Sequence, residues 1–118
     1  MSMSKPLGPY TPVVRAGDWL IVSGQLGLVD GALVRGGVGA EVSQALANMS
    51  ALLEAEGAGL SSVVRTTVYL THMSDYGPMN EAYIEAFGDH RPARAAVAVA
   101  GLPLSAKVEI EAWAHLPQ

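Results

Sequence analysis

One segment near the middle of the chain has the strongest structural pattern. Between Glu41 and Glu56 the apolar residues recur every three or four positions, which gathers them on one side of an α-helix: Val42, Ala45, Leu46, Met49, Leu52 and Leu53. Gly57 supplies the stop, because glycine accepts the left-handed backbone that ends many helices. A helix that is apolar on one side must cover another layer, and the flanking segments are predicted to form it.

Those flanking segments are typical of strands. Strands are predicted at residues 12–17, 19–24, 62–72, 94–100 and 107–116, from short apolar runs and from β-branched and aromatic residues. The apolar run from Trp19 to Gly24 suits a strand buried in a covered sheet. Residues 27–39 hold five glycines, so a loop with at most one short strand is expected there.

A second helix is predicted from Tyr76 to Phe87, capped by Ser74 or Asp75 and ended by Gly88. The order of elements is then β-β-α-β-α-β-β. The fold class that accommodates this order is α+β, with two helices covering one face of a mixed sheet. The length of 118 residues predicts a single domain over residues 1–118.

The charge content points to self-association. Charged residues make up 15% of the chain, against about 25% in an average soluble domain. A small domain has too much surface to cover with so few charges, so part of it is expected to pack against copies of the chain. The alternative is simply a composition rich in Ala, Gly and Val. The net charge of −4 and the scattered Lys and Arg predict no nucleic-acid partner.

Several other classes of site are not expected. The chain has no Cys, and His72, His90 and His115 fall on separate elements without ligand spacing, so no metal site is predicted. Residues 1–6 contain no apolar run of signal-peptide length, and no stretch has eighteen consecutive apolar residues. No membrane association is expected, and the predicted location is the cytoplasm.

The last two predicted strands place charged residues on defined sides. If the branched Val97 and Ile110 face the helices, then Arg94 and Glu109 lie together on the opposite face. The alanines 96, 98 and 100 would make that face a close-fitting subunit interface. A partly desolvated Arg and Glu there predict a binding role. The alternative is a salt bridge from Arg94 to Glu109 or Glu111 that only aligns strands or subunits.

Three stretches carry a family resemblance. They are Gly8-Pro9-Tyr10-Thr11-Pro12 with Val22-Ser23-Gly24-Gln25; residues 63–70 followed by Met73, Asp75, Tyr76, Asn80, Tyr83 and Phe87; and Arg91-Pro92-Ala93-Arg94-Ala95-Ala96-Val97 with Leu102-Pro103 and residues 108–112. In this order and spacing the chain resembles the RidA (YjgF/L-PSP) family. The resemblance implies a chorismate-mutase-like (bacillus-type) fold, a homotrimer built around a barrel of three sheets, and clefts between subunits.

The resemblance also implies an activity and a set of residues. Better-known members hydrolyse 2-imino acids and their enamine tautomers to 2-oxo acids and ammonia, with no cofactor and no metal. By motif position, Arg94 binds the substrate carboxylate and Glu109 positions or deprotonates the attacking water. Tyr10, Ser23, Gly24 and Asn80 would line the cleft. Each of these four also has a purely structural interpretation: a packed turn, a bonded strand hydroxyl, a strand-ending glycine, and a helix cap or structural hydrogen bond.

Three departures from the family pattern affect the pocket. Ala96 stands where many members have Cys, Gly101 replaces an arginine often found before Leu-Pro, and residues 26–34 lack the usual Pro-x-Thr-Gly loop. They leave the substrate preference open. The alternative functions are a regulatory trimer that binds small carboxylates without hydrolysing them, and an L-PSP-type endoribonuclease or translation inhibitor.

Overall fold

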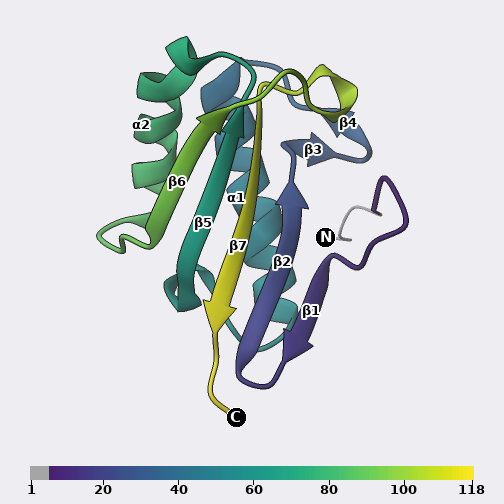
Figure 1. Ribbon diagram of the computed structural model, residues 1–118, viewed down its shortest axis with the longest axis vertical. Helices are drawn as coiled ribbons and strands as arrows, with labels where there is room; N and C mark the ends of the chain where they lie inside the picture. Colours follow the sequence, from purple (N-terminus) through teal and green to yellow (C-terminus); the bar gives the residue numbers. More distant parts are fainter. Residues whose placement is uncertain (1–5) are drawn as a thin grey trace.

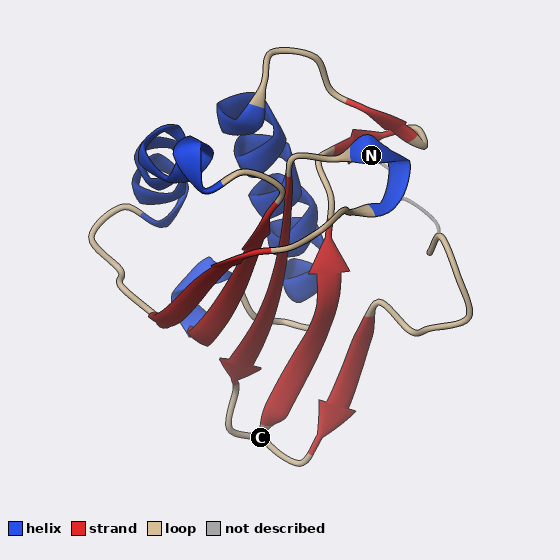
Figure 2. Ribbon diagram, turned by 45° about the horizontal axis from the view of Figure 1, so that its top comes forward, coloured by secondary structure: helices blue, strands red, loops and turns tan. Residues whose placement is uncertain are grey.

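Figure 1 shows the computed structural model, which describes residues 6–118. Its main sheet has five strands in the order β1-β2-β7-β5-β6, in which β5 and β6 are parallel and the other pairs antiparallel. The strands are β1 Val13–Ala16, β2 Trp19–Gln25, β5 Val63–Leu70, β6 Ala93–Ala98 and β7 Val108–His115. Helices α1 Val38–Ala55 and α2 Tyr76–Phe87 cover one face of this sheet (Figure 2). The predicted α+β architecture is confirmed.

Helix α1 buries the predicted stripe, including Leu46, Met49 and Leu53, against the sheet. The helix begins at Val38, earlier than the sequence pattern indicates, because Gly36 and Gly37 turn the chain into it with φ values of 119° and 88°. Gly57 ends the helical region with φ of 84°, as predicted. The apolar stripe therefore located the helix, and the glycine pair fixed its start.

The segment before α1 forms a small hairpin that the glycine content concealed. Strands β3 Leu28–Val29 and β4 Ala32–Leu33 pair antiparallel, so the segment has two short strands where at most one was expected. Asp30 and Gly31 connect them with φ values of 51° and 82°. Positive φ at both central residues is the mark of a type I′ hairpin turn, for which Asp-Gly is a preferred sequence.

Strand β7 lies in the middle of the sheet and follows the predicted alternation. Val108, Ile110, Ala112 and Ala114 are fully buried beneath the helices. Glu109, Glu111 and Trp113 point to the opposite, open face, where Glu109 lies beside Tyr69 and Glu111 beside Thr67 of β5. The Tyr69 hydroxyl donates a hydrogen bond to Glu111. The central strand thus has one apolar and one polar side.

The face assigned to Arg94 from the sequence is wrong. In the parallel register, Arg94 of β6 pairs with Thr66 and Ala96 with Val68, and both partners are fully buried on the helix side. Val97 is 42% exposed and lies on the open face with Glu109. The rule that branched residues face the core fails because β6 is an edge strand, where the small Ala96 fits close to the core and Val97 needs no cover.

The open face of the sheet carries exposed aromatic residues. Trp19 of β2 and Trp113 of β7 are 38% and 44% exposed, and their ring centroids lie 6.1 Å apart. In the isolated chain, β2 is therefore covered on the side of Leu20 and Val22 only, not on both sides as its apolar run suggested. The homotrimer stays a prediction, and the alanines 96, 98 and 100 do not form the open face on which it was argued.

Among residues 6–118, no helix combines the length and the apolar character that a membrane crossing requires. Residues 1–5, part of the segment expected to contain no signal peptide, lie outside the described residues. The cytoplasmic location stays a prediction.

A buried carboxylate ties α1 to the start of β7. Glu41 is 4% exposed, and its Oε1 accepts a hydrogen bond of 2.8 Å from the backbone N–H of Lys107. The backbone carbonyl of Lys107 accepts a hydrogen bond of 3.1 Å from the backbone N–H of Thr71. The backbone N–H and C=O of Lys107 are therefore both held by neighbouring elements, and β7 enters the sheet at a fixed position.

Replacing Glu41 is expected to destabilise the fold through the loss of an acceptor. Glu41→Ala leaves the buried N–H of Lys107 without a partner and should lower the free energy of unfolding by about 2 kcal/mol. Glu41→Gln keeps an oxygen in place and should lose less than half of that. Urea unfolding measures both, with Glu85→Ala on the exposed side of α2 as the control. Equal losses for Ala and Gln would show that the negative charge matters, not the acceptor.

Candidate active site

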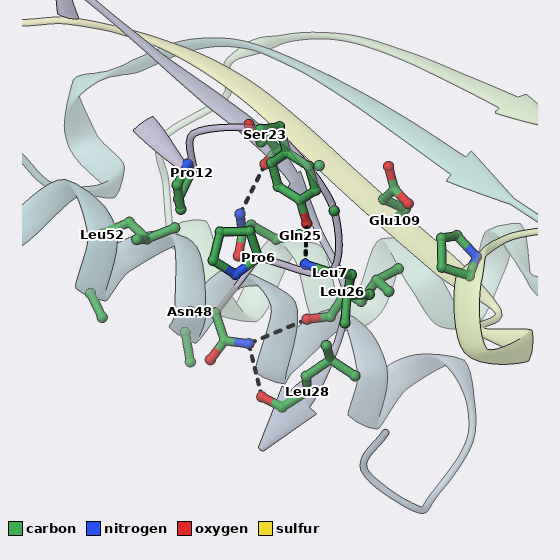
Figure 3. Close-up of a pocket in the computed structure, with 16 residues that line it drawn as sticks. Pro6, Leu7, Pro12, Ser23, Gln25, Leu26, Leu28, Asn48, Leu52 and Glu109 are labelled. Carbon is green, nitrogen blue, oxygen red and sulfur yellow. Dashed lines mark hydrogen bonds between the residues drawn. The ribbon is translucent and has the colours of Figure 1, made fainter. Parts of the chain in front are cut away.

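A cavity of about 490 Å³ opens where β2 runs out beyond β1 (Figure 3). The amino-terminal segment 6–12, the end of β2, helix α1 and β7 enclose it. Its walls are Pro6, Leu7, Gly8, Tyr10, Pro12, Ser23, Gly24, Gln25, Leu26, Leu28, Ala47, Asn48, Ala51, Leu52, Pro103 and Glu109. Four of the six predicted site residues, namely Tyr10, Ser23, Gly24 and Glu109, are among them.

The shape of the cavity follows from an interrupted sheet edge. Strand β1 pairs with β2 only as far as Val22, and the register between β2 and β7 shifts between Val22 and Gln25. Beyond that point the backbone N–H of Ser23 donates to the carbonyl of Pro12 at 2.9 Å. The Gln25 side-chain amide donates to the Ser23 carbonyl at 3.0 Å. These bonds pair the backbone polar groups of Ser23 at the edge of β2, while the space beside that edge stays open.

Two of the predicted cleft residues hold the amino-terminal segment in place. The Ser23 hydroxyl donates to the carbonyl of Thr11 at 2.6 Å. The Tyr10 hydroxyl accepts from the backbone N–H of Leu7 at 3.1 Å, which closes the Gly-Pro-Tyr turn on itself. Ser23 and Tyr10 therefore shape the cavity wall, and the structural interpretation of Ser23 as a bonded strand hydroxyl is supported.

The Glu109 side chain packs where Gly24 of β2 has no side chain. A Cβ added to Gly24 would lie 2.7 Å from the Glu109 carboxyl carbon, well inside contact distance. Gly24 does not have a left-handed φ, so the requirement is for space and not for backbone freedom. The absence of a side chain at Gly24 lets the carboxylate of Glu109 pack directly against the backbone of β2.

The electrostatics of Glu109 favour proton transfer. Partial burial raises the pKa of its carboxyl above the ordinary value, and the negative charge of Glu111 raises it further. No hydrogen bond to the carboxylate from within residues 6–118 offsets these two effects. A raised pKa brings a carboxyl closer to neutral pH, where it can both accept and return a proton.

Arg94 lies elsewhere, against helix α2. Its guanidinium donates to the Tyr76 hydroxyl at 3.0 Å and to the Met79 sulfur at 3.7 Å. The guanidinium carbon stands 4.9 Å from the ring centre of Tyr83 and 5.5 Å from that of Tyr76. Cation–π contacts with two rings hold the arginine in one orientation while leaving donors for a ligand.

Asn80 follows Met79 on the same helix. Its Oδ1 is buried and has no hydrogen-bond partner within residues 6–118. A buried acceptor without a donor is costly, and the chain's own atoms already shield this oxygen from its surroundings. Oδ1 therefore makes no cap hydrogen bond, and the role of Asn80 in the cleft stays a prediction.

The six predicted residues thus fall into two groups. Arg94 on β6 lies about two strand spacings, or roughly 10 Å, from β7, which carries Glu109, and about three, or roughly 14 Å, from β2, which carries Ser23 and Gly24. Asn80 lies on α2. Arg94 and Glu109 also project from opposite faces of the sheet. A single chain does not bring the two groups together, and Arg94 and Glu109 form no salt bridge within it.

The sequence motifs also missed contributors to both groups. Tyr76 and Tyr83 belonged to the family pattern but were given no role, although they orient Arg94. Asn48 binds the carbonyls of Leu26 and Leu28 and so shapes the cavity wall. A polar residue between the apolar positions of α1 was the available signal for Asn48. Among residues 6–118, no three His, Asp or Glu side chains gather closely enough to hold a metal ion.

Comparisons with known proteins agree with this fold. A family described as Endoribonuclease L-PSP matches residues 2–116. A 2-iminobutanoate/2-iminopropanoate deaminase of Mus musculus is 46% identical over 110 residues, which cover 92% of this chain and 80% of the mouse protein. A RutC family protein of Pyrococcus horikoshii is 43% identical over 113 residues, covering 94% of this chain and 90% of that protein.

Solved structures lead to the same conclusion. The crystal structure of RidA from the Antarctic bacterium Psychrobacter has a TM-score of 0.92 and 36% identity, and the match covers 97% of this chain and 94% of that one. The chain belongs to the RidA/YjgF/L-PSP family, as its motifs predicted.

Gly24→Ala is expected to displace the Glu109 carboxylate without unfolding the chain. The overlapping atoms are the end of a flexible side chain, which can swing towards solvent. Better hydration should then lower the pKa of Glu109 towards its ordinary value, as measured by NMR titration of the carboxyl carbon. The melting temperature should change little. Loss of the fold would instead assign Gly24 a role in the backbone of β2.

Proposed function

We propose that this chain hydrolyses 2-imino acids and their enamine tautomers to 2-oxo acids and ammonia. The observation that carries the proposal is the half-buried Glu109, whose carboxyl has a raised pKa and borders a cavity. Support comes from the 46% identity, over 92% of the chain, to a mouse protein named for the deamination of 2-iminobutanoate and 2-iminopropanoate.

The active sites of this proposal lie between subunits of a homotrimer. One subunit supplies Arg94 and Asn80 from its β6 edge and α2, and the next supplies Tyr10, Ser23, Gly24 and Glu109 from its cavity. Two features support this arrangement. Arg94 and Glu109 project from opposite faces of the sheet, and they lie on β6 and β7, which β5 separates. A cyclic trimer places the two groups opposite each other three times over.

Arg94 orients the substrate in this mechanism. Its planar guanidinium binds the carboxylate through two parallel hydrogen bonds, which fixes the adjacent imine carbon. The rings of Tyr76 and Tyr83 already hold the guanidinium in place, so little freedom is lost on binding. A lysine could not provide the same two-point contact.

Glu109 transfers protons between the water, the imine nitrogen and the leaving amine. It accepts a proton from a water molecule as the water oxygen bonds to the imine carbon and the C=N electron pair moves to nitrogen. That proton passes to the nitrogen, which gives a carbinolamine. Glu109 then transfers the hydroxyl proton to the amine, the C–N bond breaks, and ammonia leaves as the C=O bond forms. Enamine substrates first take up a proton at carbon to become imines.

Ribonuclease activity, which the family description mentions, is disfavoured by charge. The chain has a net charge of −4, and its seven Lys and Arg are scattered. RNA binding depends on neutralising phosphates with clustered basic groups. Incubation of the purified trimer with RNA should therefore give no cleavage above a buffer control.

The proposal is tested by a coupled assay in which a threonine dehydratase releases 2-iminobutanoate and the formation of 2-oxobutanoate is followed. The wild-type chain should accelerate this step. Glu109→Gln keeps the shape but not the basicity, so turnover should fall by about 10²-fold or more while carboxylate ligands still bind. Arg94→Ala should lose both binding and turnover, and Arg94→Lys should restore little.

The pH profile separates catalysis from structure. The wild-type rate should decline on the acid side at a pH above the ordinary glutamate pKa, because protonation of Glu109 removes the base. That decline should be absent from the residual rate of Glu109→Gln. Full hydrolysis by Arg94→Ala would contradict the assignment of the carboxylate-binding residue.

A shared site also predicts complementation between inactive chains. Trimers assembled at random from equal amounts of Arg94→Ala and Glu109→Gln subunits should regain about a quarter of the active sites. Each site then needs an intact Arg94 on one side and an intact Glu109 on the other. Light scattering should give a trimer for each variant. Mixed trimers without activity would place both residues in the same subunit's site, and a monomer mass would remove the shared site altogether.

A further inference from the structure

The cavity beside Glu109 has a second, apolar part. Past the polar end formed by Ser23, Gly24 and Glu109, its walls are mainly Leu7, Leu26, Leu28, Ala47, Ala51 and Leu52. We call this part the apolar lobe. Figure 3 shows Leu52 on the far side of the cavity from Glu109, with Leu26 and Leu28 below.

Helix α1 leaves the lobe open because two of its residues are small. Ala47 and Ala51 lie one turn apart and both line the cavity. The surrounding stripe of α1 consists of larger residues that are fully packed, such as Leu46 and Met49. Ala47 is exposed at the rim and Ala51 is half-buried, so a branched side chain at Ala51 would take up part of the space.

The one polar side chain on this wall is fully engaged. The Asn48 amide donates to the carbonyls of Leu26 and Leu28 at 3.2 and 3.0 Å. Its Oδ1 accepts from the Gln44 amide at 2.9 Å. A side chain with all these partners offers a ligand little polar contact. The same bonds fix residues 26–28, so the lobe is preformed and apolar.

The volume of the cavity is larger than the smallest imino acid substrates require. A volume of about 490 Å³ lies in the range that accommodates drug-sized ligands. An imino acid of three or four carbons, held by its carboxylate and placed next to Glu109, would leave the lobe empty. Filling an apolar, preformed space with an apolar side chain is favourable, and every methylene contributes.

We propose that the apolar lobe binds the substrate side chain, so that this chain prefers 2-imino acids with bulky apolar side chains, of the size of leucine, methionine or phenylalanine. This inference rests on the proposed imine hydrolysis. The carboxylate would point to Arg94 of the neighbouring subunit and the imine carbon to Glu109. The side chain would then extend along α1 towards Ala47 and Ala51.

The test compares imino acids that an amino acid oxidase releases from leucine and from alanine. The wild-type kcat/KM for the leucine-derived imino acid should exceed that for the alanine-derived one by at least about tenfold. Ala51→Leu should lower this ratio by about tenfold or more, and Ala47→Leu serves as a second variant should the first fail to fold. Ala55→Leu is the matched control, because Ala55 is exposed on the same helix and does not line the cavity.

Binding of the 2-oxo acid products keeps the inference testable apart from catalysis. By calorimetry, 4-methyl-2-oxopentanoate should bind the wild type at least about tenfold more tightly than pyruvate, and Ala51→Leu should abolish the difference. Equal affinities, or a ratio of kcat/KM unchanged by Ala51→Leu, would overturn the inference. So would a loss of trimers on Ala51→Leu, which would show that another subunit fills the lobe. Failure of all imine hydrolysis with the binding preference intact would overturn only the proposed reaction.

Discussion

The register of β7 between β2 and β5 decides what each face of the sheet can do. Side chains alternate along a strand, so a slip by one residue would move Glu109 into the core and Ile110 to the open face. The register is held where β7 begins, because Glu41 and Thr71 engage both polar groups of the Lys107 peptide. Two residues further on, Glu109 emerges at the height of Gly24, the position at which β2 has room for its carboxylate. The packing of α1 is thereby linked to the geometry of the cavity.

Periodicity in the sequence was sufficient for most of the fold. The stripe of α1, the alternation of β7 and the span of α2 could all be predicted, because each is set by which residues must leave water. The side on which Arg94 lies could not. At an edge strand made largely of alanine, neither face has a strong hydrophobic preference, and the parallel register with β5 decides instead. The close approach of Gly24 to Glu109 also joins two strands distant in sequence, and no local pattern indicates it.

The candidate site was found through motif resemblance, and the structure adds a constraint that motifs do not contain. Four of the six residues line one cavity, while Arg94 lies on the edge strand β6 and Asn80 on helix α2. Under the proposed function, the six residues form one site only where two chains meet. In the proposed trimer, assembly would be part of the active site, and substitutions at subunit contacts would act on turnover without touching a substrate-binding residue.

The aromatic residues on the open face have a practical consequence. The chain contains two tryptophans, Trp19 and Trp113, and both stand on that face, part-exposed and in edge-to-face contact. All indole fluorescence of the protein therefore originates from one surface, far from the helices. Covering this surface would move the emission to shorter wavelength, whereas events confined to the helical side would leave it unchanged. The native chain thus carries its own optical reporter of what happens on the open side of its sheet.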